Sequence, residues 1–491
     1  MASSALRRKT KWGGSTCMDK PTEIVPADCE HGVTAVASAA VPSTTVQVPP
    51  PPSTVKRANA FHRLIASTQR FRFFRNAATL TIGTAAAQGF SILAAPVLTR
   101  VCPALAIGQF ALFTSFMSIA AVGVSLKYEL GIVSAPSTSD AAHLTYASVI
   151  LSIPVSIVCG IALYGAIHYS WFGFEGLPTY SAFLMSAVLF LIGIFAALRY
   201  WAIRNERFGF ISRTIVGQHA ARAFAQVCFG ILFSGAGGLM TGELLGRAVG
   251  VSPLFRDVWP SVRKLSSDTS IRDFLHILKE YRKFVVYSLP STFIDTVVAN
   301  LPIPIIIKLY GLEDGAYFAL VQKVLAVPLG LVSASVADTF HSSFARCARE
   351  SPAQMRSLFK RTGFWLVAIG LVPSIVLIFF GRSIISVIFG SHWVVAGTLA
   401  ALSTPWFLSQ FVVSPLSRLV FVLHGQELKL IYDVVILTAM VVVTALAMWR
   451  HFTLFETVWA FSLSNAIGYA IYYLVLMRIV SKGTSLRDVR F

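Results

Sequence analysis

Five charged side chains lie deep inside long apolar stretches of this sequence: Arg222, Glu243, Arg247, Asp295 and Lys323. An ionisable group in the hydrocarbon interior of a membrane costs several kcal/mol unless it faces protein or water, so such residues are usually functional. Arginine and lysine suit anionic groups, above all phosphate and carboxylate. The three basic residues are therefore our candidates for substrate binding.

Arg222 belongs to a polar stripe on one side of its helix. Its neighbours there are Gln218, His219 and Gln226, and at 100° per residue the four cover an arc of about 100°. The stripe indicates a helix that lines a wet cavity, with the three neighbours supporting the arginine. The alternative is hydrogen bonding between helices, which polar residues in membrane helices also provide.

Glu243 and Arg247 lie four residues apart, close enough to pair on one helical face. In one interpretation they neutralise each other. In the other, Arg247 binds an anionic head group while Glu243 binds the proton or sodium ion that drives a coupled reaction.

Asp295 and Lys323 each have two interpretations as well. Apolar neighbours such as Phe293 and Val297 should raise the proton affinity of Asp295 by desolvation, which makes it a candidate for coupling to a cation gradient. Its alternative is a structural ion pair with Arg222 or Arg247. Lys323 either attracts phosphate or extends its ammonium group to the membrane surface.

Residue groupings for catalysis or for metal binding are missing from the sequence. It contains no GxSxG, GxxxxGK[ST] or HExxH motif, and its ten histidines are scattered. The six cysteines form no CxxC and read as small apolar residues. We expect a protein that is not an enzyme and has no cofactor or metal, apart from a coupling proton or sodium ion.

The composition indicates that these residues belong to membrane-spanning helices. Of the 491 residues 55% are hydrophobic and 13% charged, against roughly 25% charged in an ordinary soluble protein. The mean hydropathy is +0.69, and apolar windows of about 20 residues, the length that crosses a bilayer, recur along the chain. The fold class is therefore all-α, a polytopic membrane protein. Twelve spans are predicted at 79–100, 107–126, 145–167, 181–203, 211–233, 236–255, 284–307, 317–338, 362–381, 394–416, 430–449 and 454–477.

The distribution of basic residues orients these spans. The net charge is +19, from 41 Lys and Arg against 22 Asp and Glu, and with both termini inside, most basic residues fall in cytoplasmic tails and loops. They serve orientation against an anionic leaflet, so nucleic acid is not an expected partner.

Composition also divides the chain into segments. We predict a disordered, basic and Pro-rich cytoplasmic tail at 1–76, with an interfacial helix at 61–75 or merely a basic flank there. The segments that follow are an N-lobe at 77–255, a basic cytoplasmic linker at 256–283, a C-lobe at 284–480 and a cytoplasmic tail at 481–491.

The two lobes resemble each other. A shift of 208 residues aligns Pro96-Val97-Leu98-Thr99-Arg100 with Pro304-Ile305-Ile306-Ile307-Lys308. Both lobes start from the cytoplasm, so the repeat is parallel and related by an axis along the membrane normal. Two pseudo-symmetric six-helix lobes around a central cavity are the architecture of an alternating-access transporter. Pro302 and Pro304 should also interrupt the seventh span, since proline lacks a backbone donor.

Several short stretches in order resemble Wzx-type polysaccharide flippases over about residues 75–480. They are Gly83 to Gln88, Pro96 to Arg100, Gly108 to Leu112, Lys127 to Ile132, Phe389 to Trp393 and Ser414 to Arg418. The resemblance implies the multidrug/oligosaccharidyl-lipid/polysaccharide (MOP) exporter superfamily, with a cationic cavity between two lobes. The long N-terminal tail departs from the usual short start.

The resemblance further implies a flippase for polyprenyl-diphosphate-linked oligosaccharides in the bacterial cytoplasmic membrane, serving exopolysaccharide or lipopolysaccharide O-antigen synthesis. Its partners would be membrane lipids, with a polymerase and glycosyltransferases of the same pathway. A diphosphate that crosses hydrocarbon needs fixed cations, and Arg222, Arg247 and Lys323 are available. The alternatives are a cation-coupled drug or metabolite antiporter of the same superfamily, a membrane polymerase or transferase, and a scaffold without transport.

Overall fold

The computed structural model describes residues 54–233, 235–266, 271–350, 352–423 and 426–482. By its internal contacts the chain divides into residues 1–65 and 66–491, and all contacts below lie within the second unit. Within the described ranges every regular element is helical, so the predicted all-α class is confirmed. Most of the predicted N-terminal tail and the C-terminal tail lie outside the described residues.

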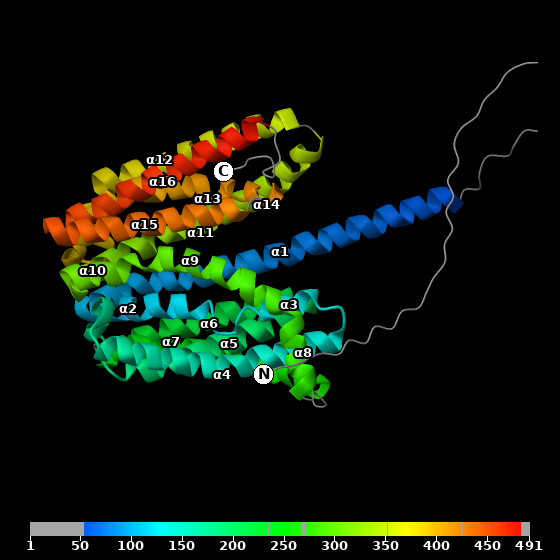
Figure 1. Ribbon diagram of the computed structural model, residues 1–491, viewed down its shortest axis with the longest axis horizontal. Helices are drawn as coiled ribbons and strands as arrows, with labels where there is room; N and C mark the ends of the chain where they lie inside the picture. The colour runs from blue at the N-terminus through cyan, green and yellow to red at the C-terminus, as the bar shows by residue number, and fades with distance from the viewer. Residues whose placement is uncertain (1–53, 234, 267–270, 351, 424–425, 483–491) are drawn as a thin grey trace, which may run out of the picture. The chain divides into compact units, whose positions relative to one another are not determined.

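The first half of the chain supplies seven α-helices and one short 3-10 turn, drawn from blue to green in Figure 1. They are α1 (Thr54–Val101), α2 (Ala104–Ala121), α3 (Glu129–Ser134), α4 (Thr138–His168), η1 (Trp171–Gly176), α5 (Ser181–Arg204), α6 (Phe208–Phe233) and α7 (Ala236–Leu265). We call this set the N-terminal half. The predicted interfacial helix at 61–75 is part of α1, and its place at a membrane surface stays a prediction.

The second half begins after the connecting helix α8 (Ile271–Glu280). The C-terminal half comprises η2 (Phe284–Ser288), α9 (Leu289–Asn300), α10 (Pro302–Tyr310), α11 (Leu312–Glu350), α12 (Pro352–Phe389), η3 (Ser391–Trp393), α13 (Val394–Leu416), α14 (Leu419–Val422), α15 (Gln426–Arg450) and α16 (Leu454–Lys482). The predicted linker at 256–283 contains the end of α7 and all of α8, and the segment boundaries stay predictions.

Nine helical segments of the described chain are long and apolar enough to cross a membrane, and each matches a predicted span. The remaining three predicted spans fall in α6, α7 and α11. In α6 and α7 the charges of Arg222, Glu243 and Arg247 lower the hydropathy of helices whose length would suffice to cross. A multi-pass membrane fold is confirmed, whereas the count of twelve stays a prediction.

The prolines break the seventh predicted span as expected, because α9 ends at Asn300 and α10 begins at Pro302. The carbonyl of Asn300 would normally accept the amide of residue 304, but Pro304 has no N–H to donate. Ser115 of α2 takes that place, and its hydroxyl donates to the Asn300 carbonyl at 2.7 Å. A backbone group that proline leaves free thus joins the two halves.

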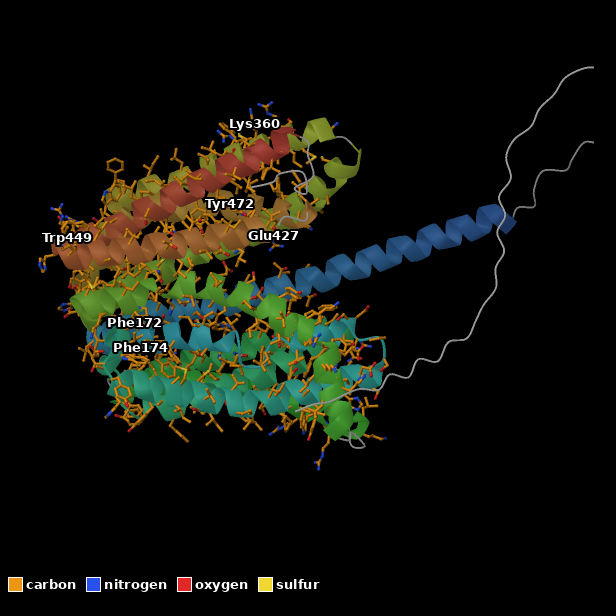
Figure 2. The ribbon with its side chains drawn as sticks, in the orientation of Figure 1. Phe172, Phe174, Lys360, Glu427, Trp449 and Tyr472 are labelled. Carbon is orange, nitrogen blue, oxygen red and sulfur yellow. The ribbon has the colours of Figure 1, made fainter. Side chains whose placement is uncertain are left out.

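The two halves also touch at the end of the bundle where α1 ends and α2 begins, which we call the closed end. There Arg100 donates to the Val387 carbonyl of the C-terminal half at 2.8 Å, and Lys308 pairs with Glu175 of the N-terminal half at 2.6 Å. Trp449 and Phe172 mark this end in Figure 2. Arg100 and Lys308 are equivalent under the 208-residue shift, so the repeat places one cross-contact in each half.

Within the N-terminal half, α6 and α7 pack closely along a row of glycines four residues apart on α7. Close approach of helix backbones through small residues is common in membranes. A Cβ added at any of these glycines would lie within 3 Å of a residue of α6. The pairs are Gly238 with Phe229, Gly242 with Gln226, Gly246 with Arg222, and Gly250 with Gln218. This row fixes the backbone that carries Arg222.

We predict that Gly246→Ala lowers stability, because its Cβ would lie 2.8 Å from the Cα and 2.4 Å from the Cβ of Arg222. Overpacking of this kind costs about 1–3 kcal/mol. The measurement is the melting temperature of purified protein, followed by tryptophan fluorescence. Gly217→Ala on the open side of α6, where nothing lies within 4 Å, is the matched control. Equal melting temperatures for Gly246→Ala and the wild type would contradict close packing.

Candidate functional site

A cavity of about 600 Å³ lies between the two halves and is lined by both. The N-terminal half contributes residues of α1, α2, α6 and α7, and the C-terminal half contributes residues of α9, α10 and α11. Most of the lining is apolar, but polar and charged groups converge at one part of the wall. The charged lining residues are Arg222, Glu243, Arg247 and Lys323.

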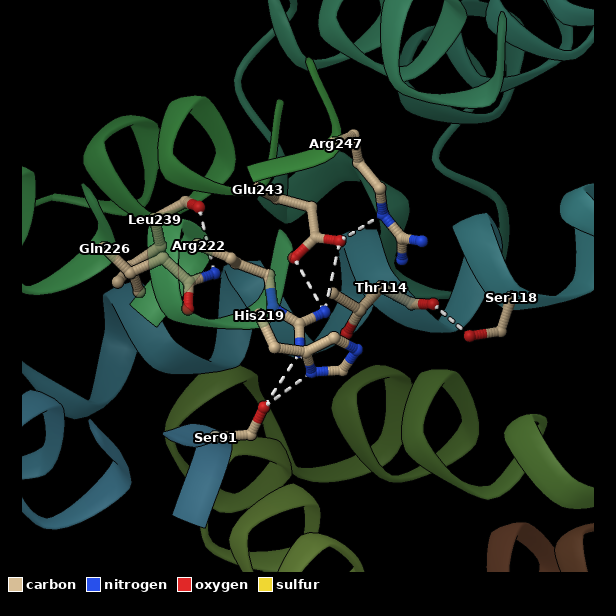
Figure 3. A network of polar contacts seen from close by, with 9 residues as sticks. All are labelled: Ser91, Thr114, Ser118, His219, Arg222, Gln226, Leu239, Glu243 and Arg247. Carbon is tan, nitrogen blue, oxygen red and sulfur yellow. Dashed lines mark hydrogen bonds and ion pairs between the residues drawn. The ribbon is translucent and has the colours of Figure 1, made fainter. Parts of the chain in front are cut away.

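Glu243 is the centre of the charged group. Its side chain is 2% exposed and lies between two arginines, as Figure 3 shows. The Nε of Arg247 donates to Oε1 at 2.9 Å, and Nη1 of Arg222 lies 3.5 Å from both carboxylate oxygens. The pairing of Glu243 with Arg247 that the four-residue spacing predicts is present, and Arg222 joins it from the neighbouring helix.

Arg222 is oriented on its other side by α1 and by its own helix. Its Nη2 donates to Ser91 Oγ at 2.8 Å and to Nδ1 of His219 at 2.9 Å. Because a guanidinium only donates, His219 Nδ1 accepts, and a neutral ring then carries its proton on Nε2. Three partners on three helices therefore hold one guanidinium at the cavity wall.

Lys323 reaches the same cavity from α11 of the C-terminal half. Its side chain is exposed, and within the described part of the chain it has no ion-pair partner. Among the described lining residues, three cations against one carboxylate leave a surplus of two positive charges. A cavity wall with this surplus favours an anionic group with several oxygen acceptors.

The polar stripe predicted on α6 divides between two roles. His219 and Arg222 face the cavity, and Gln226 lines it while donating to the Leu239 carbonyl of α7 at 3.3 Å. Gln218 is 3% exposed, packs against Gly250 and is not among the lining residues. Gln226 thus combines both interpretations, since it lines the cavity and bonds to the neighbouring helix, whereas Gln218 packs between the helices.

Asp295 lies away from this group. Its partner is Lys429 of α15 at 2.9 Å, and its side chain is 58% exposed. The expected apolar surroundings are therefore wrong, and neither Arg222 nor Arg247 is its partner. The surroundings of Asp295 depend on its ion pair with another helix, and the sequence next to Asp295 does not indicate that pair.

Three further residues of these sites were missed from the sequence. Ser91 has no distinguishing spacing in α1. Lys429 and Asp433 lie four residues apart and pair at 2.8 Å, so their helical spacing was an available signal. Lys429 instead looked like an ordinary basic residue flanking the predicted span at 430–449.

The charge group yields a prediction for stability. Glu243→Gln should lower the free energy of unfolding by about 3 kcal/mol, because two guanidinium groups would lose their shared counter-charge. Arg247→Gln should cost less, since Arg222 still pairs with Glu243. The double variant Glu243→Gln/Arg247→Gln should be about 1–3 kcal/mol more stable than the two single effects predict.

Melting temperatures of the four proteins give this coupling. The exposed Glu427→Gln on α15 is the control for loss of a carboxylate outside the cavity. Strictly additive effects would mean that Glu243 and Arg247 do not depend on each other.

The family described as polysaccharide biosynthesis protein matches residues 70–397. No curated protein matches the sequence.

Solved structures give the fold. The lipid II flippase MurJ, in an inward closed conformation, superposes with a TM-score of 0.63 at 16% identity, over 82% of this chain and 90% of that one. An inward-facing multidrug resistance MATE family transporter of the MOP superfamily gives 0.55 at 16% identity, over 81% and 95%. A MOP superfamily transporter from Pyrococcus furiosus gives 0.53 at 15% identity, over 84% and 96%.

At these identities the superpositions establish that the described helices have the MOP fold. The family match covers most of the chain and confirms the recognition made from its short stretches. This multi-pass membrane protein belongs to the polysaccharide biosynthesis protein family.

Proposed function

We propose that this protein moves polyprenyl-diphosphate-linked oligosaccharides from the inner to the outer leaflet of a bacterial cytoplasmic membrane by alternating access. The observation that carries the proposal is the surplus of two positive charges on the wall of a cavity between two helical halves. A diphosphate leaving water needs such fixed donors, since an isolated charge in hydrocarbon is prohibitively costly.

The donor set suits a diphosphate. Arg222 and Arg247 are held by Glu243 and come from the N-terminal half, whereas Lys323 comes from the C-terminal half. An anion bound between them would contact both halves at once. A ligand that contacts both halves changes their relative stability in each conformation, which is the requirement for driving a conformational cycle.

The family and the fold support the same proposal. The family match names polysaccharide biosynthesis, and MurJ, a similar solved structure, is a lipid II flippase. For this chain, the proposal includes a lipid-linked sugar as the substrate and its export for exopolysaccharide or O-antigen synthesis. It also includes membrane lipids, a polymerase and glycosyltransferases as partners. Cytoplasmic termini and the absence of enzymatic activity are parts of it as well.

A drug or metabolite antiporter fits the cavity less well. Glu243 is the single carboxylate among the lining residues that the structure describes, and it is almost fully buried and already bound to two guanidinium groups. A cationic drug would have to displace an arginine. Coupling to a proton or sodium ion through Glu243 or Asp295 stays a prediction, because both carboxylates have basic partners.

We expect Arg222→Gln and Lys323→Gln each to reduce surface polysaccharide by more than tenfold. Each variant is expressed in cells from which the chromosomal copy of this gene has been deleted. Each change removes one of the fixed cations, while the fold and the membrane level of the protein should be kept. The measurements are surface polymer, lipid-linked oligosaccharide accumulated in the inner membrane, and protein level in the same membranes.

Lys360→Gln is the matched control for Lys323→Gln. Lys360 is exposed on α12 and does not line the cavity, and Figure 2 shows its position. Normal polymer with both cavity variants would refute the proposed role of the cations. Loss of polymer without accumulation of the lipid-linked precursor would point to synthesis, the role of a polymerase or transferase.

A further inference from the structure

The C-terminal half contains a second polar pocket of about 390 Å³ that the proposed function does not use. Its size lies in the range of small-ligand sites. The side chains that line it include Asp295, Asn300, Gln410, Asp433, Tyr469 and Tyr472. Ala299 and Asn300 line this pocket and the central cavity alike, so the two spaces adjoin.

The charges of this pocket are already balanced in large part. The Lys429 ammonium donates to Asp295 at 2.9 Å and to Asp433 at 2.8 Å, and the side chain of Asp433 is only 5% exposed. A free cation would have to compete with this ammonium for both carboxylates. The carboxylate oxygens keep further lone pairs, however, that can accept from the hydroxyl groups of a neutral ligand.

Three tyrosines form one wall. The rings of Tyr432 and Tyr472 stack with centroids 4.4 Å apart, and Tyr469 packs on Tyr432 at 5.3 Å. Their helices α15 and α16 approach closely at Gly468, where a Cβ would lie 2.2 Å from the Ile436 side chain. The wall combines rigid apolar ring surface with phenolic hydroxyl groups.

Two of these hydroxyl groups, those of Tyr432 and Tyr472, make no hydrogen bond to any described residue. Tyr472 is 4% exposed. Figure 2 labels it among the C-terminal helices. A buried polar group without a hydrogen bond destabilises the fold, so a ligand that supplies a hydroxyl partner would be favoured here.

We propose that this pocket binds the sugar residues of the substrate, while Arg222, Arg247 and Lys323 hold its diphosphate. The inference rests on the proposed function and adds the site of sugar recognition to it. Sugars carry hydroxyl groups for the paired carboxylates and amides, and C–H faces for the tyrosine rings. The shared wall at Ala299 and Asn300 lets one ligand occupy both spaces.

The test compares two lipids on the purified full-length protein. The probes are undecaprenyl diphosphate, which has no sugar, and lipid-linked oligosaccharide extracted from cells that lack this gene. Apparent Kd values come from the rise in melting temperature with lipid concentration. The variants are Tyr472→Phe and Gln410→Ala in the pocket, Arg222→Gln in the cavity, and the exposed Tyr287→Phe as control.

Tyr472→Phe should leave the empty protein equally or more stable, because it removes an unpaired buried hydroxyl. It should nevertheless weaken binding of the oligosaccharide lipid about three- to tenfold, as loss of one hydrogen bond does, and change binding of undecaprenyl diphosphate less than twofold. Gln410→Ala should behave alike. Arg222→Gln should weaken both lipids, and Tyr287→Phe neither.

Three results would overturn the inference. The first is equal affinity of the wild type for both lipids, which leaves the head-group function intact but removes sugar recognition. The second is equal weakening of both lipids by the pocket variants. The third is a rise in melting temperature with sodium chloride, but not with choline chloride, that is absent in Asp295→Asn. That result would make the pocket a cation site. If the wild type binds neither lipid, the proposed function fails as well.

Discussion

Two arginines share one buried carboxylate, and the arrangement of the cavity depends on that contact. Glu243 can lie at 2% exposure in an apolar bundle because Arg247 on its own helix and Arg222 on the next both balance its charge. Because one carboxylate partly neutralises two guanidinium groups, both arginines can remain at the cavity wall, and the three groups together keep a net positive charge. The glycine row of α7 is the condition for it, since a larger residue at Gly246 would separate the helices.

The sequence predicted the local features of this site well. Apolar windows of the length of a membrane span located the helices, and the four-residue spacing of Glu243 and Arg247 predicted their pairing, because both signals come from residues near one another along the chain. The proline break after Asn300 was predictable for the same reason. The count of twelve spans stays a prediction, because the charges in α6 and α7 lower the hydropathy of two of the helices that it includes.

Contacts between helices were beyond such reasoning. Asp295 and Lys429 are 134 residues apart, and nothing in either segment indicates that α9 lies against α15. The division of the α6 stripe, with Gln218 against α7 and Arg222 in the cavity, depends on how near α7 can come. Its glycines at four-residue spacing contained that information, and the spacing of small residues is therefore as informative as the spacing of charges in membrane helices.

The carbonyl of Asn300 has a consequence for how the two halves can separate. Its hydrogen-bond partner is Ser115 of the opposite half, and Pro304 can never replace that partner from within the helix. Separation of α2 from α9 therefore requires another donor at that carbonyl, and water is the donor that an opening crevice admits. Hydration of the crevice and movement of the halves must then proceed together, so a dry, partly separated intermediate would be disfavoured.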